Sequence, residues 1–395
     1  MISKVALPPV RTKDRFLIFG APRIDEPEIN EVISSMRSGW LGTGPKVAQF
    51  EKDFAAYRDM KYGVALYSCT AALHLSMLAA GLKPGDEVIT TPLTFCATVN
   101  AIIHAGATPV LADVDPLTQC ICPRSVESKL TSRTRALLPV HFAGRPCNMD
   151  ALMPIVRSRN LTLIEDCAHA IETEYHSKPA GSFGDYGCFS FYVTKNIVTG
   201  EGGMVLTNNE DIAARIKMLG LHGMSRDAWK RFSDEGYKHY YVLEAGFKYN
   251  MMDLQAAIGV HQLQKVHAYW TRRQEVWNRY NEAFRDLPIG LPADPEPNTR
   301  HAYHLYTLMI DKNRCGISRD EFLSAMTANG IGVGVHYLSI PEHPYYQKTF
   351  NWKLEDTPNA VKLGRETVSI PLTPKLSDAD VNDVITAVRR ILGRD

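Results

Sequence analysis

Residues 161–207 read LTLIEDCAHAIETEYHSKPAGSFGDYGCFSFYVTKNIVTGEGGMVLT. Three short apolar runs in this stretch, LTLIEDCA, GCFSFYV and GGMVLT, have the length and the β-branched or aromatic content of buried strands. Charged residues mark two of them, because Glu165 and Asp166 end the first run and Lys195 comes shortly after the second. A charge at an otherwise interior position costs free energy unless it is paired. We therefore interpret Lys195 as a residue that performs chemistry.

The same alternation continues upstream, from about residue 60. Four further runs have strand character: GVALYS, EVITTP, TPVLADVD and RALLPVHF. Between the strands, apolar residues recur at helical spacing in TAALHLSMLAAG, FCATVNAIIHAG and MDALMPIVRSRN, and these segments end near glycine or asparagine. Strands that alternate with helices predict a mostly parallel sheet with helices on both faces. The expected fold class is therefore α/β.

Beyond the sheet, residues 252–284 have the pattern of one long helix, and a proline-rich link, DLPIGLPADPEP, follows it. We expect a large domain over residues 1–260 and a smaller C-terminal α+β domain over residues 261–395, with this helix bridging them. HAYHLYTLMID predicts a strand, and Ser318 with Glu321 has the spacing of a capping box that starts the next helix. A last helix, SDADVNDVITAVRRIL, is expected to pack on the small domain through one apolar face: Val381, Val384, Ile385, Val388, Ile391 and Leu392.

The composition excludes several classes of function. The 44 lysines and arginines nearly balance the 43 acidic residues, so the chain has no electrostatic footprint for nucleic acid or a membrane surface. No apolar run approaches the roughly 20 residues of a membrane span, and prolines interrupt the start of the chain, where a signal peptide needs apolar residues. We expect a cytoplasmic protein that acts on small molecules.

The eight cysteines are scattered along the chain, and no pair of CxxC motifs frames a zinc site. We therefore expect no metal. Cys120 and Cys122 are close enough in sequence to be redox-active. In a strand-like segment, however, two such side chains share one face and more often simply pack, which is the interpretation that we favour.

Ligands of open α/β sheets bind beyond the carboxyl ends of the strands, so the polar residues at those ends are the candidates for a site. Ser68, Cys69 and Thr70 open a helix after GVALY, where free N–H groups and a hydroxyl form either a phosphate cradle or an ordinary N-cap. Asp166 either faces a cation or caps the AHAI segment that follows it. Lys195 breaks the tie, because a lysine that meets an aldehyde and an aspartate that meets a ring nitrogen together describe a pyridoxal phosphate (PLP) site.

At these residues the chain resembles a known family. The run IEDCAHAIETEYHSKPAGSFGDYGCFSFYVTKNIVTGEGGMVLTNN closely resembles the DegT/DnrJ/EryC1/StrS family, the nucleotide-sugar aminotransferases of the aspartate aminotransferase fold. The likeness extends from SGWLGTGPKVAQFEKDFA, near residue 38, to VHY at residue 337, and its most specific motif is the lysine followed by GEGG. The resemblance implies PLP fold type I, PLP as the cofactor, and a homodimer with shared sites.

The resemblance also implies roles for individual residues. Lys195 corresponds to the Schiff-base lysine and later proton carrier, and Asp166 to the partner of the ring nitrogen. The other cofactor contacts follow by position: His169 near the phenolic oxygen, Phe95 stacked on the ring, Thr70, the Ala71 backbone and Ser190 around the phosphate, and Asn250 reaching the phosphate of the other subunit. Burial is expected to lower the pKa of Lys195, and the glycines after it are expected to leave room for a ligand or for the partner's backbone.

Each of these residues also has a plainer interpretation. Phe95 could be core, Ser190 a strand hydroxyl, Asn250 a helix cap and His169 a hydrogen-bonded core histidine. Arg226, in LHGMSRDAW, either contacts the nucleotide diphosphate or is a solvated loop charge, and His336, in GVGVHY, either lies at the mouth of the site or does not take part. Two positions depart from the family pattern: Cys69 replaces a common glycine, and Cys167 replaces a common alanine.

Three functions are compatible with such a site. The first is an aminotransferase that moves an amino group from glutamate to a nucleotide-linked keto sugar for polysaccharide, glycan or natural-product biosynthesis. A PLP-dependent lyase and a non-catalytic regulator with this fold are the alternatives. The family's dehydratases have histidine where this chain has Lys195, so the lysine favours transamination. GFKYNMMDLQAAIGVHQL, CGISRD and LHGMSRDAW most resemble members that aminate C4 of a UDP-linked 4-keto sugar, although a GDP- or dTDP-linked sugar and a 3-keto sugar stay open.

Overall fold

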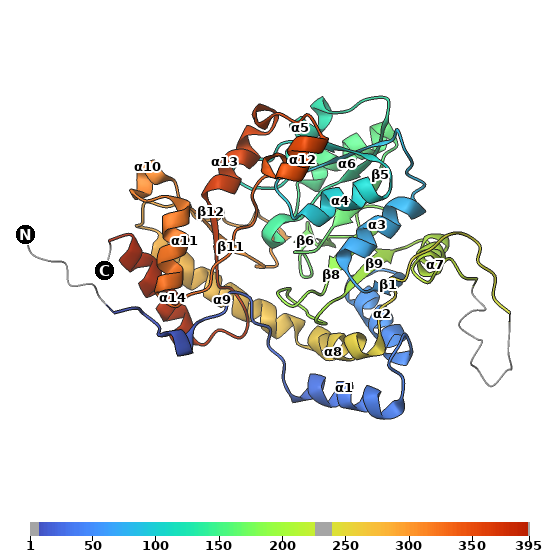
Figure 1. Ribbon diagram of the computed structural model, residues 1–395, viewed down its shortest axis with the longest axis horizontal. Helices are drawn as coiled ribbons and strands as arrows, with labels where there is room; N and C mark the ends of the chain where they lie inside the picture. The colour runs from blue at the N-terminus through green and yellow to red at the C-terminus, as the bar shows by residue number, and fades with distance from the viewer. Residues whose placement is uncertain (1–7, 226–238, 394–395) are drawn as a thin grey trace, which may run out of the picture.

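The computed structural model describes residues 8–225 and 239–393 (Figure 1). A seven-stranded sheet forms the centre of the larger lobe. Its strands lie in this order: β1 (Tyr62–Leu66), β9 (Gly203–Thr207), β8 (Tyr186–Ser190), β5 (Thr162–Asp166), β4 (Thr134–Leu138), β2 (Glu87–Thr90) and β3 (Thr108–Leu111). Strand β9 runs in the direction opposite to that of the other six strands of this sheet. The predicted α/β class and all seven predicted strands are confirmed.

Helices cover both faces of the sheet because successive strand residues point to opposite sides. Ile164 packs on one face, against helices α3 (Cys69–Ala79), α4 (Cys96–His104) and α7 (Glu210–Leu219). Leu163, its neighbour in β5, packs on the other face. The helices of that face are α2 (Pro45–Tyr57), α5 (Pro123–Ser128), α6 (Met149–Arg159) and α8 (Asp253–Gln264). Because both faces of the sheet are buried, the strand sequences are apolar at nearly every position.

The prediction of one long helix over residues 252–284 is wrong in one respect. The segment forms two helices, α8 and α9 (Val266–Phe284), which meet at Lys265. The Lys265 N–H donates to the Gln262 carbonyl three residues back. This is the hydrogen bond of a 3₁₀ turn, which is tighter than an α-helical turn, and α8 ends there. The Lys265 ammonium is also held by Glu28 of helix α1 (Glu26–Ser38). The two helices follow one another beneath the sheet and lead into the C-terminal lobe (Figure 1).

The C-terminal lobe is built on a two-stranded antiparallel sheet, β11 (Tyr306–Met309) with β12 (Thr367–Ile370). Its apolar core is shared with α9, α11 (Arg319–Ala328) and α14 (Asp378–Ile391). The predicted strand at residues 301–311 is thus shorter than expected. The remaining elements are α10 (Lys312–Cys315), α12 (Pro344–Thr349), α13 (Pro358–Glu366) and a small sheet of β10 (Thr299–Arg300), β6 (Glu174–Tyr175) and β7 (Lys178–Pro179).

Two segments cross the domain division expected from the sequence. Val10 and Leu17 pack on the C-terminal core, and Leu17 forms a β-bridge with Ile331. In the other direction, Tyr346 of α12 packs on Val99 of α4 in the large lobe. The two lobes are therefore tied together from both ends of the chain. No helix among the described residues is long and apolar enough to cross a membrane.

The capping box at the start of α11 is present as predicted. Ser318 Oγ accepts from the Glu321 N–H at 3.3 Å, and the Glu321 carboxylate accepts from the Ser318 N–H at 2.7 Å. We expect Ser318→Ala to lower the free energy of unfolding by about 1 kcal/mol, because an N-terminal amide of the helix loses its acceptor. Urea denaturation measures this. Ser324→Ala, in the middle of the same helix, is the control and should be nearly neutral; equal losses in both variants would contradict the prediction.

Candidate active site

One cavity of about 520 Å³ opens at the carboxyl ends of β5 and β8, with residues of both lobes in its walls. Seven of the predicted site residues line it: Thr70, Phe95, Asp166, His169, Ser190, Lys195 and His336. They come from segments spread over more than half of the chain. The fold therefore gathers at one point the polar residues that the sequence places at separate strand ends.

Lys195 lies five residues after β8 ends, and its backbone N–H is held by the Tyr192 carbonyl. Desolvation of its amine lowers the pKa from 10.5 to about 8, although Cys69 and Asp166 raise it. Burial removes water that would stabilise the ammonium form, so more of the neutral, nucleophilic amine is present near neutral pH. The expected lowering of the Lys195 pKa is borne out.

Asp166 ends β5 and is almost fully buried. Desolvation raises the pKa of its carboxyl, while hydrogen bonds from the Ala168 N–H and the Thr98 hydroxyl and the charge of Lys195 act to lower it. The interpretation of Asp166 as a helix cap is wrong, because the residues directly after it form turns and no helix begins there. Its carboxylate instead forms part of the cavity wall.

Helix α3 begins beside this wall, with Ser68 as its N-cap. The Ala71 N–H donates to Ser68 Oγ at 3.1 Å, and Ala71 does not line the cavity. Thr70 does line it, as does Ser190 at the end of β8. Ser190 Oγ accepts from the Tyr192 N–H, which leaves the serine hydroxyl proton free to donate. The positive end of α3 and these two hydroxyls suit an anion.

One of the glycines after Lys195, Gly203, makes room for this chain's own backbone. A Cβ on Gly203 would lie 2.3 Å from the Ser68 carbonyl carbon and 2.5 Å from the Cys69 nitrogen. Gly200 faces open space and has a φ of +83°, which favours glycine. The expectation that all of these glycines leave room for a ligand or a partner is therefore corrected at Gly203, where the start of α3 fills the space.

Phe95 is 57% exposed and lines the cavity, so it is not a core residue. His169 is buried, and both of its ring nitrogens have partners within the chain. Nδ1 accepts from the Ala143 N–H at 3.2 Å, so Nε2 carries the proton that it shares with the Tyr337 hydroxyl at 3.1 Å. Burial lowers the pKa of His169 well below its usual value. His169 is thus a neutral ring fixed in one tautomer.

Comparison with known proteins identifies the chain. The model of the DegT/DnrJ/EryC1/StrS aminotransferase family matches residues 22–389. The chain is 48% identical over 384 residues to the spore coat polysaccharide biosynthesis protein SpsC of Bacillus subtilis, covering 97% of this chain and 99% of SpsC. The chain belongs to the DegT/DnrJ/EryC1/StrS aminotransferase family. It is a PLP-dependent nucleotide-sugar aminotransferase, and the lyase and regulator alternatives are set aside.

Two solved structures share the fold of this aminotransferase. The PLP form of Spr1654 from Streptococcus pneumoniae has a TM-score of 0.89 at 29% identity, covering 96% of this chain and 99% of that one. DesI, solved in the presence of its TDP-sugar product, has a TM-score of 0.86 at 31% identity, covering 98% and 95%. The expected PLP fold type I is therefore confirmed.

The residues present fit the cofactor. A lysine whose amine is largely desolvated, a buried carboxylate, and hydroxyls at a helix N-terminus meet at one cavity, and Gly203 lets the chain approach the start of α3. Lys195 would hold the aldehyde carbon, Asp166 the ring nitrogen, and Thr70 and Ser190 the phosphate. These assignments, like those of Phe95 and His169, remain predictions.

Among the cavity-wall residues that sequence reasoning missed are three with hydrogen bonds to other site residues or to Asn196: Thr98, His304 and Tyr337. Thr98 donates to Asp166, and Tyr337 bonds to His169. His304 Nδ1 bonds to Asn196 Oδ1 at 2.9 Å, and its ring lies 4.4 Å from that of His169. The only available sequence signal was for Tyr337, which follows the predicted His336 directly. His336 itself lines the cavity and bonds to Ser369 Oγ at 2.8 Å.

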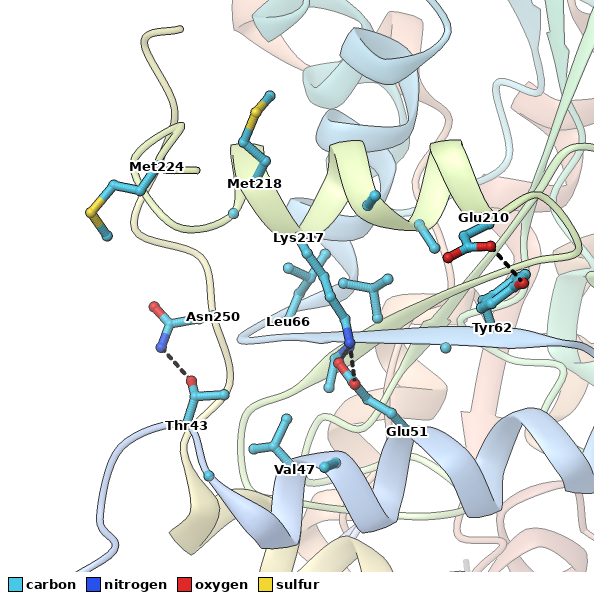
Figure 2. Close-up of a pocket in the computed structure, with 18 residues that line it drawn as sticks. Thr43, Val47, Glu51, Tyr62, Leu66, Glu210, Lys217, Met218, Met224 and Asn250 are labelled. Atoms are coloured by element: carbon cyan, nitrogen blue, oxygen red, sulfur yellow. Dashed lines mark hydrogen bonds and ion pairs between the residues drawn. The ribbon is translucent and has the colours of Figure 1, made fainter. Parts of the chain in front are cut away.

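Asn250 lies at a different cavity, of about 400 Å³, beside β1, α2 and α7 (Figure 2). Its Nδ2 donates to Thr43 Oγ1 at 2.7 Å, while Oδ1 is buried with no hydrogen-bond partner among the described residues. The interpretation of Asn250 as a helix cap is wrong, because the N-cap of α8 is Met252. Arg226, the other predicted contact beyond the cavity, lies outside the described residues.

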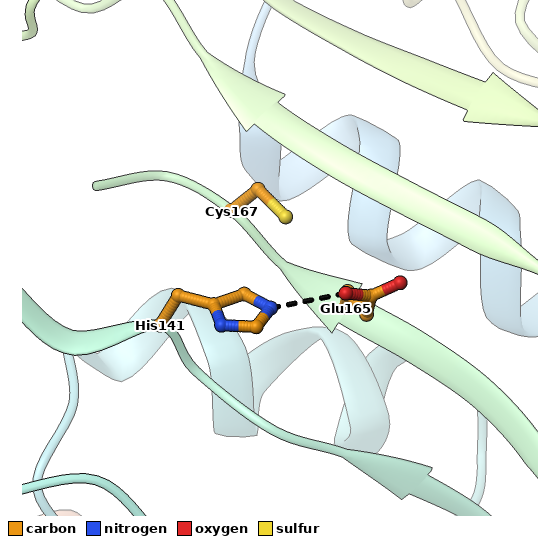
Figure 3. A group of neighbouring side chains, drawn as sticks. All are labelled: His141, Glu165 and Cys167. Atoms are coloured by element: carbon orange, nitrogen blue, oxygen red, sulfur yellow. Dashed lines mark hydrogen bonds and ion pairs between the residues drawn. The ribbon is translucent and has the colours of Figure 1, made fainter. Parts of the chain in front are cut away.

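Glu165, which precedes Asp166, points to the opposite side of β5 and forms a group with His141 and Cys167 (Figure 3). His141 Nδ1 accepts from the Cys147 N–H, so its Nε2 donates to Glu165 at 3.0 Å. Glu165 also accepts from three backbone N–H groups of residues 181–184. Burial raises the pKa of the Cys167 thiol well above its usual value. A proton already occupies the ring nitrogen that a metal would need, so we interpret this group as structural.

The low pKa of Lys195 generates a prediction. Because only the neutral amine adds to an aldehyde, the cofactor-free protein should take up PLP at a rate that rises with pH through a midpoint near 8. The appearance of visible absorbance measures the rate. Lys195→Ala should show no such band, while Lys217→Ala, which removes an ion-paired lysine elsewhere, should keep the midpoint. A midpoint near the ordinary lysine value of 10.5 would contradict the assignment.

Proposed function

We propose that this aminotransferase moves an amino group from glutamate to C4 of a UDP-linked 4-keto sugar, in the biosynthesis of a surface polysaccharide or glycan. The observation that carries the proposal is that Lys195 and Asp166 open on one cavity whose wall also has the hydroxyls of Thr70, at the N-terminus of α3, and Ser190, at the end of β8. The polysaccharide context is supported by the likeness to SpsC, which is named for spore coat polysaccharide biosynthesis.

Three residues of the site, Lys195, Asp166 and Phe95, each have a physical task in the proposed reaction. Bound PLP supplies an aldehyde and a ring that accepts electrons from the substrate. Lys195 Nζ can take and return a proton near neutral pH, because its pKa is about 8. Asp166 keeps a proton on the ring nitrogen. Phe95 presents an exposed aromatic face to the cavity and would cover one side of the ring, which also excludes water there.

The shape of the substrate favours C4 as the sugar position without excluding C3. The pyrophosphate and base must remain in the outer part of the cleft, so the far side of the sugar ring approaches Lys195. C4 lies opposite the anomeric carbon that bears the pyrophosphate. The resemblance of GFKYNMMDLQAAIGVHQL, CGISRD and LHGMSRDAW to UDP-4-amino-4-deoxy-L-arabinose aminotransferase favours the same position and UDP. A 3-keto sugar needs only a modest rotation of the ring and is the second candidate.

Glutamate as the donor needs cations for its two carboxylates. Among the described residues that line the cavity, Lys195 is the only lysine, and no arginine is present. The three histidines there, His169, His304 and His336, have pKa values lowered chiefly by burial, His336 to about 3, so they are neutral near pH 7. A cation for these carboxylates has to come from beyond the described residues of this cavity, and we propose that a second subunit brings it.

A homodimer is the arrangement that we propose, with Asn250 of one subunit reaching the cofactor phosphate of the other. Asn250 does not line the Lys195 cavity of its own chain. Thr43 Oγ1 donates to the Met251 carbonyl at 2.6 Å and so accepts from Asn250 Nδ2, which fixes the amide in one orientation. The second Nδ2 proton is the one that can reach a phosphate oxygen, while Oδ1, which is buried without a partner among the described residues, only accepts and should gain a donor in the assembly.

Helix α1 supports the same proposal, because it buries an acidic side chain and exposes large apolar ones. Glu28 faces inward, where it binds Lys265 and Gln262, and the apolar side chains face outward. Five large apolar side chains are more than a third exposed on α1 and just after it: Ile29, Ile33, Met36, Trp40 and Leu41. The segment that carries them leads directly to Thr43 and the Asn250 contact. An apolar surface of this kind marks a protein interface, and we assign it to the second subunit.

The substrate proposal predicts the site of amination. With glutamate, PLP and matched UDP-, dTDP- and GDP-linked sugars, each as its 3-keto and 4-keto form, we expect the UDP-linked 4-keto sugar to react fastest. NMR of the product should place the new amine on C4. The pyridoxamine form should also appear with glutamate alone, without any keto sugar. Preferred amination at C3, or activity only on free amino acids, would contradict the proposal.

The dimer proposal predicts complementation between two inactive variants. Lys195→Ala lacks the amine, and Asn250→Asp places a negative charge beside the partner's phosphate. One site of the mixed dimer has both native residues, so random mixing in equal amounts should restore about a quarter of wild-type turnover. Native mass spectrometry verifies the mixed dimer, and Lys195→Ala mixed with itself is the control. Verified mixed dimers without recovered turnover would show that each chain builds its site alone.

A further inference from the structure

The carboxylate of Asp166 is held from two sides. Its Oδ1 accepts from the Ala168 N–H at 3.1 Å, two residues along the same chain segment. Its Oδ2 accepts from Thr98 Oγ1 at 2.8 Å, a contact that joins residues far apart in sequence. Each carboxylate oxygen has two acceptor positions, so each bond leaves one position free for a further donor.

The Thr98 hydroxyl is itself held by a second hydroxyl. Thr94 Oγ1 lies 2.8 Å from Thr98 Oγ1, and both threonines are nearly fully buried and line the cavity. A carboxylate can only accept, so Thr98 uses its single proton on Asp166. Thr98 Oγ1 then accepts from Thr94, which makes Thr94 the donor. The two hydroxyl protons thus point in one direction, along a chain that ends at the carboxylate.

This chain of hydroxyls also fixes the segment that contains Phe95. Thr94 and Thr98 lie on either side of that residue at the start of α4, and the Thr98 N–H bonds to the Phe95 carbonyl at 3.2 Å. The segment that carries the Phe95 ring and the carboxylate of Asp166 are therefore connected through one residue, Thr98, by its backbone N–H and its hydroxyl respectively. An ordinary helix start would need no bond to a residue of β5.

The two threonine hydroxyls help to keep the Asp166 carboxyl in its charged form. Burial raises the pKa of Asp166, which opposes its charged form, and the two hydrogen bonds act against burial. The positive charge of Lys195 acts in the same sense as the hydrogen bonds, and so would a protonated His141. The other titratable groups that interact with Asp166 are the Cys69, Cys167 and Cys188 thiols and the Tyr337 hydroxyl, whose pKa values burial raises, so they stay neutral. Hydrogen bonds to a charged group are among the stronger ones in proteins.

We propose that Thr98 is a positioning residue for the cofactor: its hydroxyl, oriented by Thr94, holds the Asp166 carboxylate in its charged form and in the orientation that meets the ring nitrogen. The inference rests on the proposed role of Asp166. The rival explanation is that the two threonines only satisfy each other at the start of α4. The two explanations differ in what happens to the bound cofactor when the Thr98 hydroxyl is removed.

The test uses Thr98→Val, which keeps the shape of the side chain and removes the hydroxyl, in the protein with PLP bound. A ring nitrogen that holds its proton less firmly withdraws less electron density from the nitrogen of Lys195. We therefore expect the pH midpoint of the visible absorption band to rise by about one unit. Conversion to the pyridoxamine form by glutamate alone should slow by roughly tenfold. Thr98→Ser restores the donor and should return both values toward wild type.

A matched control and a second variant keep the test decisive. Thr90 is a buried threonine of β2 whose hydroxyl donates to the Leu138 carbonyl, so Thr90→Val loses a buried hydroxyl without touching Asp166. It should keep the wild-type midpoint. If Thr98→Val does not fold, Thr94→Val should still raise the midpoint, by a smaller amount. The inference is overturned if folded Thr98→Val shows both the wild-type pH midpoint and the wild-type rate with glutamate. If Thr98→Val does not fold, the same result in Thr94→Val overturns it.

Asp166→Asn separates this inference from the proposed function. We expect that variant to retain PLP but to react with glutamate at least about tenfold more slowly. If it does so while Thr98→Val behaves as wild type, only the role of Thr98 fails. If Asp166→Asn itself reacts at the wild-type rate, the role of Asp166 fails, and the inference about Thr98 fails with it.

Discussion

The desolvation of one amine is the constraint on which the site depends. Lys195 has a pKa of about 8 because burial removes the water that would stabilise its ammonium form. Burial requires a surrounding wall, and most of this wall comes from elements distant in sequence: the start of α3, the start of α4, the end of β5 and the C-terminal lobe. Gly203 shows the constraint most directly, since any larger residue would push the start of α3 away from the cavity.

Strand geometry gives the two adjacent acids of β5 opposite tasks. Side chains alternate across a strand, so Glu165 and Asp166 must point to different faces of the sheet. On its face, Glu165 accepts from His141 and from three backbone N–H groups, which ties down residues 181–184 just before β8. Asp166 on the other face keeps acceptor positions open at the cavity. The first acid thus holds the segment that leads to Lys195, and the second keeps acceptor positions for the proposed contact with the ring nitrogen.

The sequence predicted the strands because burial on both faces leaves long apolar runs, and it predicted Lys195 and Asp166 because charge interrupts those runs. The break at Lys265 was not predictable from periodicity, because the apolar pattern continues through it and the acids that hold its ammonium lie in α1. Thr98 was missed for a similar reason. Its bond to Asp166 spans 68 residues, and a threonine near a helix start has an ordinary local explanation.

The electrostatics of the cavity make Lys195 the side chain best suited to the proposed proton transfers. His169, His304 and His336 look like candidate acids or bases, but burial is the largest cause that lowers the pKa of each. His169 and His304 are also committed to hydrogen bonds, to Tyr337 and Asn196 respectively. A buried imidazole in this state orients its neighbours and titrates only in acid. Burial therefore acts in opposite ways on function: it makes the histidines inert near neutral pH and brings Lys195 into the range where an amine can both give and take a proton.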